Sequence, residues 1–199
     1  MKKLLTCMII IASLLLACGS SRQVSRIAAD TTTDLSGKWN DTDSRLVSQE
    51  MIDDCLSRPW INEFNMAEGR KPAVIVGTIR NKSHEHIDTE TFTKDFEREL
   101  INSGKVKFVA SQGERQEIRE ERMDQQEHSS DETAKRLAEE TGADYILQGS
   151  IKTIVDQIEG RRVIFYQTDM ELINVESNEK VWIGDKKIKK EITQKGKKW

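Results

Sequence analysis

The sequence has few of the residues that cross-link small secreted folds. It contains three cysteines and two prolines in 199 residues. Cys7 is expected to leave with a leader peptide and Cys18 to be modified, so Cys55 is the one cysteine left with a free thiol. A single cysteine cannot form an intramolecular disulfide. Cys55 lies at helical spacing with Met51 and Ile52, which favours a small buried hydrophobe over the alternative, a catalytic thiol.

A strong charge of one sign is also missing. The chain has 31 Lys and Arg against 34 Asp and Glu, a net charge of -3. Removing residues 1–17, which carry Lys2, Lys3 and no acidic residue, changes this to -5. A mildly acidic chain gives no reason to expect nucleic acid as a partner. With a mean hydropathy of -0.62, the rest of the chain is expected to be one soluble domain without a second membrane segment.

Long apolar runs are absent except at the N-terminus. Lys2 and Lys3 precede the uncharged segment Leu4–Ala17, which is shorter than the roughly 20 residues that span a bilayer. A basic start, a short apolar middle and a small residue before the break are typical of a signal peptide. Leu15–Cys18, LLAC, resembles the bacterial lipobox, in which the cysteine is alkylated with lipid and becomes the first residue. A plain secretory signal is the alternative.

The remaining chain divides into two parts. Residues 18–37 are small and polar and are predicted to be a flexible tether. Residues 38–199 are predicted to form one α/β domain with a mixed sheet packed with helices, a β-α-β unit followed by an antiparallel meander. The two or more acyl chains expected at Cys18 would anchor this domain stably to a membrane.

Hydrophobic periodicity predicts the elements of this domain. A helix is expected from residues 40–43 to Leu56, ended by Pro59. A strand buried on both faces is expected over 71–80, then a helix capped by Thr89 or Thr91. The following ranges complete the prediction: a strand at 106–111, a poorly held helix at 113–128, a helix from Ser130 to Gly142, and three strands at 144–157, 161–175 and 180–192.

The sequence contains no pattern that predicts catalysis. His84, Glu85 and His86 follow the first expected strand, but two histidines need a third ligand, so a metal-free loop is favoured over a metal site. No phosphate-binding glycine motif and no serine nucleophile motif occurs. The chain is therefore predicted to be a non-enzyme, with no catalytic residue, no cofactor, no metal and no small-molecule substrate.

Two features instead suggest contact with a partner. Apolar residues fall on the nominally outward face of the meander, and the candidate partner-binding residues are Phe165, Ile173 and Trp182. Either helices cover this face or it is an interaction patch. The lysine-rich segment 186–198 is either a basic tail for an anionic partner or the solvated end of an edge strand.

Several segments resemble the LpoB family of outer-membrane lipoproteins, which activate bifunctional class A penicillin-binding proteins. They include DLSGKWNDTDSRLVSQEMIDDCL, KPAVIVGTIRNKSHEHIDTETF, ERELINSGKVKFVAS, ETGADYILQGSI and NEKVWIGDKKIKK. The resemblance implies a fold similar to the N-terminal domain of TolB and a regulator of peptidoglycan synthesis. It also implies a bifunctional penicillin-binding protein as partner and an outer-membrane anchor facing the periplasm.

The resemblance leaves one alternative function open, and this sequence departs from the family in one feature. An accessory or scaffold lipoprotein of another envelope or secretion assembly, like the relative CsgG, is the alternative function. The departure is the tether, since the best-known family member has a long linker. Here the tether, 18–37, reaches at most roughly 65 Å when fully extended.

Overall fold

The computed structural model describes residues 23–110, 112–127 and 142–194. The chain separates into two units, Met1–Thr31 and Thr32–Trp199, and the second contains the folded domain. The expected leader, Cys18 and the helix expected from Ser130 lie outside the described residues.

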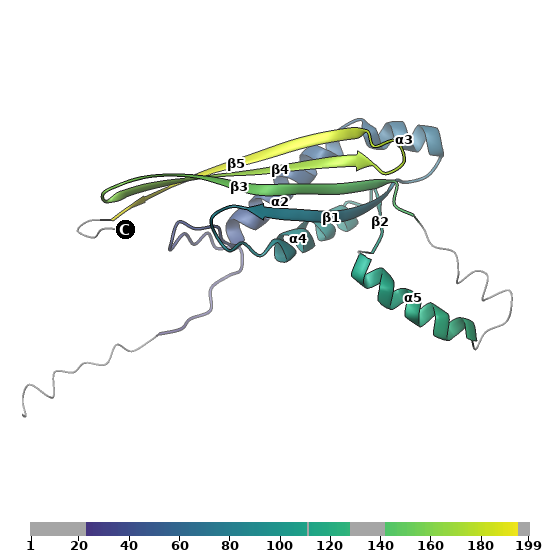
Figure 1. The fold of residues 1–199 in the computed structure, drawn as a ribbon, viewed down its shortest axis with the longest axis horizontal. Coiled ribbons are helices and arrows are strands. Elements are labelled where there is room, and N and C mark those ends of the chain that lie inside the picture. The colour runs from purple at the N-terminus through teal and green to yellow at the C-terminus, as the bar shows by residue number, and fades with distance from the viewer. Residues whose placement is uncertain (1–22, 111, 128–141, 195–199) are drawn as a thin grey trace, which may run out of the picture. The chain divides into compact units, whose positions relative to one another are not determined.

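The domain is a five-stranded mixed sheet with helices (Figure 1). Its strand order is β2-β1-β3-β4-β5; β1 is parallel to β2 and β3, while β3, β4 and β5 are antiparallel neighbours. This confirms the predicted α/β class. The elements are α2 (Asp41–Ser57), α3 (Trp60–Glu68), β1 (Ala73–Lys82), α4 (Thr89–Asn102), β2 (Lys107–Phe108), α5 (Gln112–Glu127), β3 (Tyr145–Ile158), β4 (Arg161–Asn174) and β5 (Lys180–Thr193).

Helix α2 begins where its sequence satisfies the free backbone N–H groups. The Asn40 side chain accepts a hydrogen bond from the Asp43 N–H, and the Asp43 carboxylate accepts one from the Asn40 N–H, a reciprocal capping box. Its apolar stripe, which includes Val47 and Met51, is buried. The prediction of this helix is confirmed almost to the residue.

Other boundaries differ from the prediction. Asp88, not Thr89 or Thr91, caps α4. Strand β2 has two residues where six were expected. Helix α3 was not predicted, because Pro59 was read only as a stop; proline also fits the start of a helix, where no N–H donor is needed.

The helices α2, α3 and α4 cover one face of the sheet. Side chains of a strand alternate between faces, and on β4 the buried series is Ile164, Tyr166, Thr168, Met170 and Leu172. On β1, Val74, Val76 and Ile79 are buried on the same side, whereas Arg80 and Lys82 are exposed. The prediction that β1 is buried on both faces is therefore wrong for its C-terminal half.

Residues 32–40 precede α2, and we call this segment the strap. It packs against the sheet where β4 begins and β5 ends. The Trp39 ring contacts the Tyr166 ring edge-on at 5.5 Å. The Glu85 carboxylate accepts hydrogen bonds from the Trp39 N–H at 3.0 Å and from the Tyr166 hydroxyl at 2.9 Å. Gly37, at φ 69°, lies so close to the Ile192 side chain that a Cβ atom would clash with it. The strap, the loop after β1 and the sheet are thereby joined at one point.

Lys190 joins the strap to α2 and β5. Its Nζ lies 2.6 Å from a carboxylate oxygen of Asp34 and 2.6 Å from one of Asp43. Burial alone would lower the pKa of Lys190, but the hydrogen bonds that it donates to Asp34 and Asp43 outweigh burial and raise that pKa. The Lys190 hydrogen bond lowers the pKa of Asp34, while burial raises the pKa of Asp43 despite the same lysine. Asp43 therefore depends on Lys190 for its charge.

Replacing Lys190 with methionine should lower the free energy of unfolding by about 3 kcal/mol at pH 7, because a buried carboxylate is left without its cation. Urea denaturation would measure the change. Lys187→Met, which removes a lysine from the exposed Asp185 pair, should cost less than about 0.5 kcal/mol. Asp43→Asn should recover part of the loss in the Lys190→Met background. Equal effects of the two lysine variants would contradict this account.

Candidate partner-binding surface

The sheet face turned away from α2, α3 and α4 has no helix over it among the residues described. It combines β3, β4 and β5, and we call it the open face. Its apolar members are Ile146, Ile154, Ile158, Val163, Phe165, Ile173 and Ile183. Ile154, Ile158 and Ile183 are 67%, 68% and 64% exposed. They form two groups, one around Ile154 and Phe165 and the other around Ile173 and Ile183. Exposed apolar groups are typical of an interaction surface.

The apolar members form cross-strand pairs. Phe165 is opposite Ile154, and Ile173 is opposite Ile146; directly opposite side chains on a sheet touch. Phe165 and Ile173 are half-buried by these neighbours. Each presents the remaining surface outward, so the structure brings the predicted residues Phe165 and Ile173 onto one face.

Trp182, which the sequence grouped with them, lies on the opposite, covered face. It pairs with Leu172, is 5% exposed, and its indole N–H donates to Asp54 on α2 at 2.8 Å. The ring lies across Gly184, where a Cβ atom would stand 2.2 Å from it. Trp182 is thus a packing residue between β5 and α2. Ile183, the neighbour of Trp182 on β5, lies on the open face. It was not among the predicted partner-binding residues.

Ion pairs lie between and beside the two apolar groups of the open face. Lys152 contacts Asp169 at 2.7 Å, Lys180 contacts Glu171 at 2.9 Å, and Lys187 contacts Asp185 at 2.8 Å. Exposed pairs of this kind contribute little to stability. They can exchange partners with charges on another protein, so the open face offers two apolar groups with charged side chains between them.

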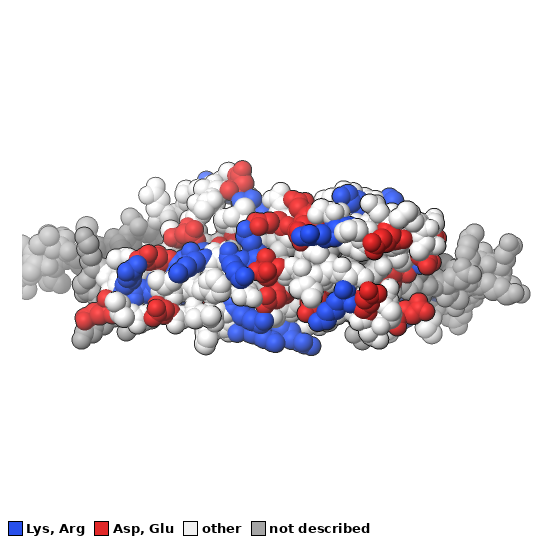
Figure 2. Space-filling model, turned by 90° about the horizontal axis from the view of Figure 1, so that it is seen from above, with Lys and Arg blue, Asp and Glu red and all other residues white. Residues whose placement is uncertain are grey.

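The lysines of β5 are paired rather than gathered into a basic field. Lys186 contacts Glu50 on α2, Lys187 contacts Asp185, and Lys190 contacts two carboxylates. The side of the molecule in Figure 2 accordingly intersperses basic with acidic side chains. For β5 this favours the edge-strand interpretation over a free basic tail; residues 195–198 lie outside the described part.

The described residues hold no assembled reactive site. Glu85 is engaged by Trp39 and Tyr166, and the His84 ring lies against Thr153 Oγ1 at 3.1 Å. Within the described ranges, no group of three or more His, Cys, Asp or Glu could hold a metal ion. None of the helices in those ranges has the length and apolar character needed to cross a membrane.

Cys55 is 1% exposed, and burial, with a contribution from the Asp54 charge, raises its pKa to about 12. The thiol is therefore protonated at neutral pH and shielded. Iodoacetamide at pH 8 should leave Cys55 unmodified in the folded protein and alkylate it fully in 6 M guanidinium chloride, because a thiolate is the reactive form. Peptide mass spectrometry would read the site. Rapid alkylation of Cys55 in the folded chain would contradict its assignment as a core residue.

The sequence profile of the family described as peptidoglycan-synthase activator LpoB matches residues 43–188. Among solved structures, the LpoB C-terminal domain from Salmonella enterica is similar at 18% identity over 73% of this chain and 98% of that one, with a TM-score of 0.41. The corresponding Escherichia coli domain gives 17% identity, the same coverages and a TM-score of 0.41. The NMR structure of E. coli LpoB gives 16% identity over 89% of this chain and 87% of that one, with a TM-score of 0.39. No curated protein sequence matches the chain.

Proposed function

Because this chain belongs to the LpoB family of peptidoglycan-synthase activators, we propose that it regulates peptidoglycan synthesis by binding and activating a class A penicillin-binding protein. The observation that carries the proposal on the structural side is the open face. A regulator without a reactive site acts by contact, and contact needs a surface that the domain's own helices leave free. The open face offers such a surface, with exposed apolar groups towards both ends of its strands.

The main contacts of the proposed interface are Phe165 and Ile183, one in each apolar group of the open face. Aromatic and large aliphatic side chains at the centre of an interface usually supply most of its binding free energy. Here the cost of ordering them is low, because strand pairing already fixes the backbone and Ile154 supports the Phe165 ring. The pairs Lys152–Asp169 and Lys187–Asp185, which lie between these two contacts, would steer a partner of complementary charge.

The proposed location is the outer membrane, with the domain facing the periplasm and the acyl chains on Cys18 as the anchor. The lipobox-like LLAC and the absence of aspartate after Cys18 support this placement. Since the strap already packs on the domain, the free part of the tether is shorter than 18–37. The partner synthase would therefore have to extend towards the outer membrane to be reached.

Substituting Phe165 or Ile183 with aspartate should reduce capture of the penicillin-binding protein and stimulation of its glycan polymerisation by about tenfold or more, as expected of interface centres. The measurement is the rate of lipid II consumption with increasing amounts of purified protein. Ile101→Asp is the matched control, since Ile101 is also an exposed isoleucine (54% exposed) and lies on α4.

Full stimulation by both open-face variants would exclude this face, and no stimulation by the wild-type protein would remove the proposed function. Capture of a different envelope protein by the open face would favour the scaffold alternative.

Mass spectrometry of the mature protein should give an N-terminus at Cys18 carrying acyl chains. Cys18→Ser should abolish the added mass and release the protein from the membrane fraction, because a single residue carries the whole anchor. Cys55→Ser is the control and should remain lipidated. An unmodified residue 18 in the wild-type protein would contradict the anchor.

A further inference from the structure

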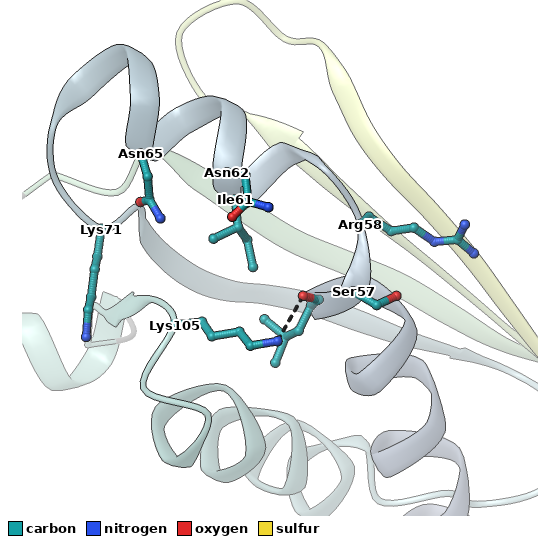
Figure 3. A pocket seen from close by; sticks show the side chains of 8 residues that line it. Ser57, Arg58, Ile61, Asn62, Asn65, Lys71 and Lys105 are labelled. Carbon is teal, nitrogen blue, oxygen red and sulfur yellow. Dashed lines mark hydrogen bonds between the residues drawn. The ribbon is translucent and has the colours of Figure 1, made fainter.

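The end of α2 borders two hollows in the surface of the domain. One, which we call the basic pocket, has a volume of about 360 Å³ and lies where the end of α2, helix α3, the loop before β1 and the loop between α4 and β2 meet (Figure 3). Its polar lining residues include Asn62, Asn65, Lys71 and Lys105. Lys71 donates to the Gly104 carbonyl and Lys105 to the Leu56 carbonyl. The two lysines are thus held apart and offer no common point of attachment for a ligand.

The second hollow is a groove between α2 and β5. In Figure 3 Arg58 points away from the lysines of the basic pocket, and it also lines this groove. The groove has a volume of about 360 Å³ and is further lined by Glu50, Met51 and Asp54 on α2 and by Ile183, Gly184 and Asp185 on β5. One of its walls is therefore the outer edge of a β-strand.

Half of the backbone groups of β5 face outward from the sheet at this edge. β5 is the last strand in the order of the sheet, and β4 pairs with one side of it. The Gln194 N–H donates to the Gly160 carbonyl at 2.9 Å, so the even-numbered residues of β5 make the hydrogen bonds to β4. Hydrogen-bonded and non-hydrogen-bonded residues alternate in an antiparallel pair. The groups of the odd-numbered residues consequently point outward, at Ile183, Asp185, Lys187, Lys189 and Glu191.

These outward groups have no partner among the described residues. No backbone hydrogen bond joins them to another described segment, and all five residues are exposed. Figure 1 shows β5 at the border of the sheet without a strand beyond it. Unpaired N–H and C=O groups in a row are a template for the addition of another strand.

Helix α2 limits what can pair with this edge. It lies along β5, since Glu50 contacts Lys186 and Asp54 accepts a hydrogen bond from the Trp182 indole at 2.8 Å. A second copy that paired through its own β5 would place its own α2 over the adjacent strand, about 4.8 Å away. Packed helices lie roughly 8–10 Å apart. The groove therefore suits a single extended segment that carries no helix on this side.

The side chains of the edge indicate the charge of that segment. Lys187 and Lys189 occupy successive outward positions and lie on the open face. Lys187 contacts Asp185, whereas Lys189, opposite Phe165, has no ion pair with any residue in the described ranges. Opposite charges directly across two strands are favourable, and like charges are unfavourable. An added strand with acidic residues at alternate positions therefore fits this edge, and a basic strand does not.

The other face of an added strand would meet α2. Leu46 lies one turn before Glu50 on the same flank of the helix, because residues four apart share a helix face. Its side chain is apolar and 46% exposed. Apolar residues between the acidic positions of the segment would cover Leu46.

We propose that the outer edge of β5 binds an extended segment of a partner protein as an additional strand, with acidic residues beside Lys187 and Lys189 and apolar residues towards Leu46. Main-chain hydrogen bonds supply the affinity of such an added strand, and its alternating side chains supply the specificity. The edge binds through its backbone, whereas the open face binds through side chains. The proposal therefore does not depend on the proposed function.

The test is hydrogen exchange, followed by NMR on the full chain, with a blocked seven-residue peptide in which valine alternates with glutamate. In the free protein the amides of Lys187 and Lys189 should exchange rapidly, and those of Ile188 and Lys190 slowly, because only the second pair is bonded to β4. With about 90% of the edge occupied, exchange at Lys187 and Lys189 should slow about tenfold, since the free fraction alone exchanges. No added protection would overturn the proposal. Slow exchange of these two amides in a peptide-free dimer would overturn it in favour of a second copy.

N-methylated peptides distinguish strand addition from binding by side chains alone. Only one of the two alternate sets of peptide N–H groups can face β5. Methylation of that set, at the valines or at the glutamates, should abolish binding, and methylation of the other set should leave binding unchanged. Equal binding by both methylated peptides would overturn the proposed main-chain recognition.

A charge-reversed variant tests the chemistry of the segment. Lys189→Glu should weaken binding of the glutamate peptide about tenfold and should permit binding of a peptide with lysine in place of glutamate, because attraction and repulsion across the strands are exchanged. Lys82→Glu is the matched control, since Lys82 is an exposed lysine on β1, which β3 and β4 separate from β5. Equal affinity of the wild-type protein for the lysine and glutamate peptides would overturn the acidic class of partner.

Discussion

The remaining structure depends on one constraint. The three long strands, β3, β4 and β5, pack against helices on one side only. Side chains of β3, β4 and β5 alternate strictly, so residues of one parity form the core with α2 and α4 and residues of the other parity stay outside. Tyr166, Met170 and Leu172 are fully buried, whereas Phe165 and Ile173 between and beside them are only half-buried. A shift of one residue in pairing would exchange the two sets. The open face is therefore fixed by the same pairing that makes the core.

The two ends of the sheet are built differently, and this gives the domain a direction. At one end the strap is held by Glu85, Tyr166 and Lys190 through hydrogen bonds and ion pairs. At the other end, loops and the end of α2 leave a basic pocket between them. The chain continues towards Cys18 only from the strap end. The pocket and the strap lie at opposite ends of the sheet, and the open face runs along its length.

Much of this fold was predictable because it follows from local patterns. The capping residues around Asn40 and the alternation along β4 predicted α2 and the meander closely, and the α/β class followed from the order of the elements. Trp182 was misplaced for a physical reason. Val181, Trp182 and Ile183 are all apolar, so only the pairing of β5 with β4 decides which one faces α2. The Glu85–Tyr166 contact joins residues far apart in sequence, and no periodicity signals it. The pocket was missed because its residues are ordinary lysines and asparagines brought together from four separate segments.

The strap also determines how the domain would respond to mechanical load. A pull along the chain from the direction of residue 31 reaches the domain at Asp34 and Gly37, next to β5 and Tyr166. The force would act first on the Asp34–Lys190 ion pair and then on the Trp39 contacts with Glu85 and Tyr166, before any strand pairing is loaded. The strap is therefore the first part of the domain to carry such a load.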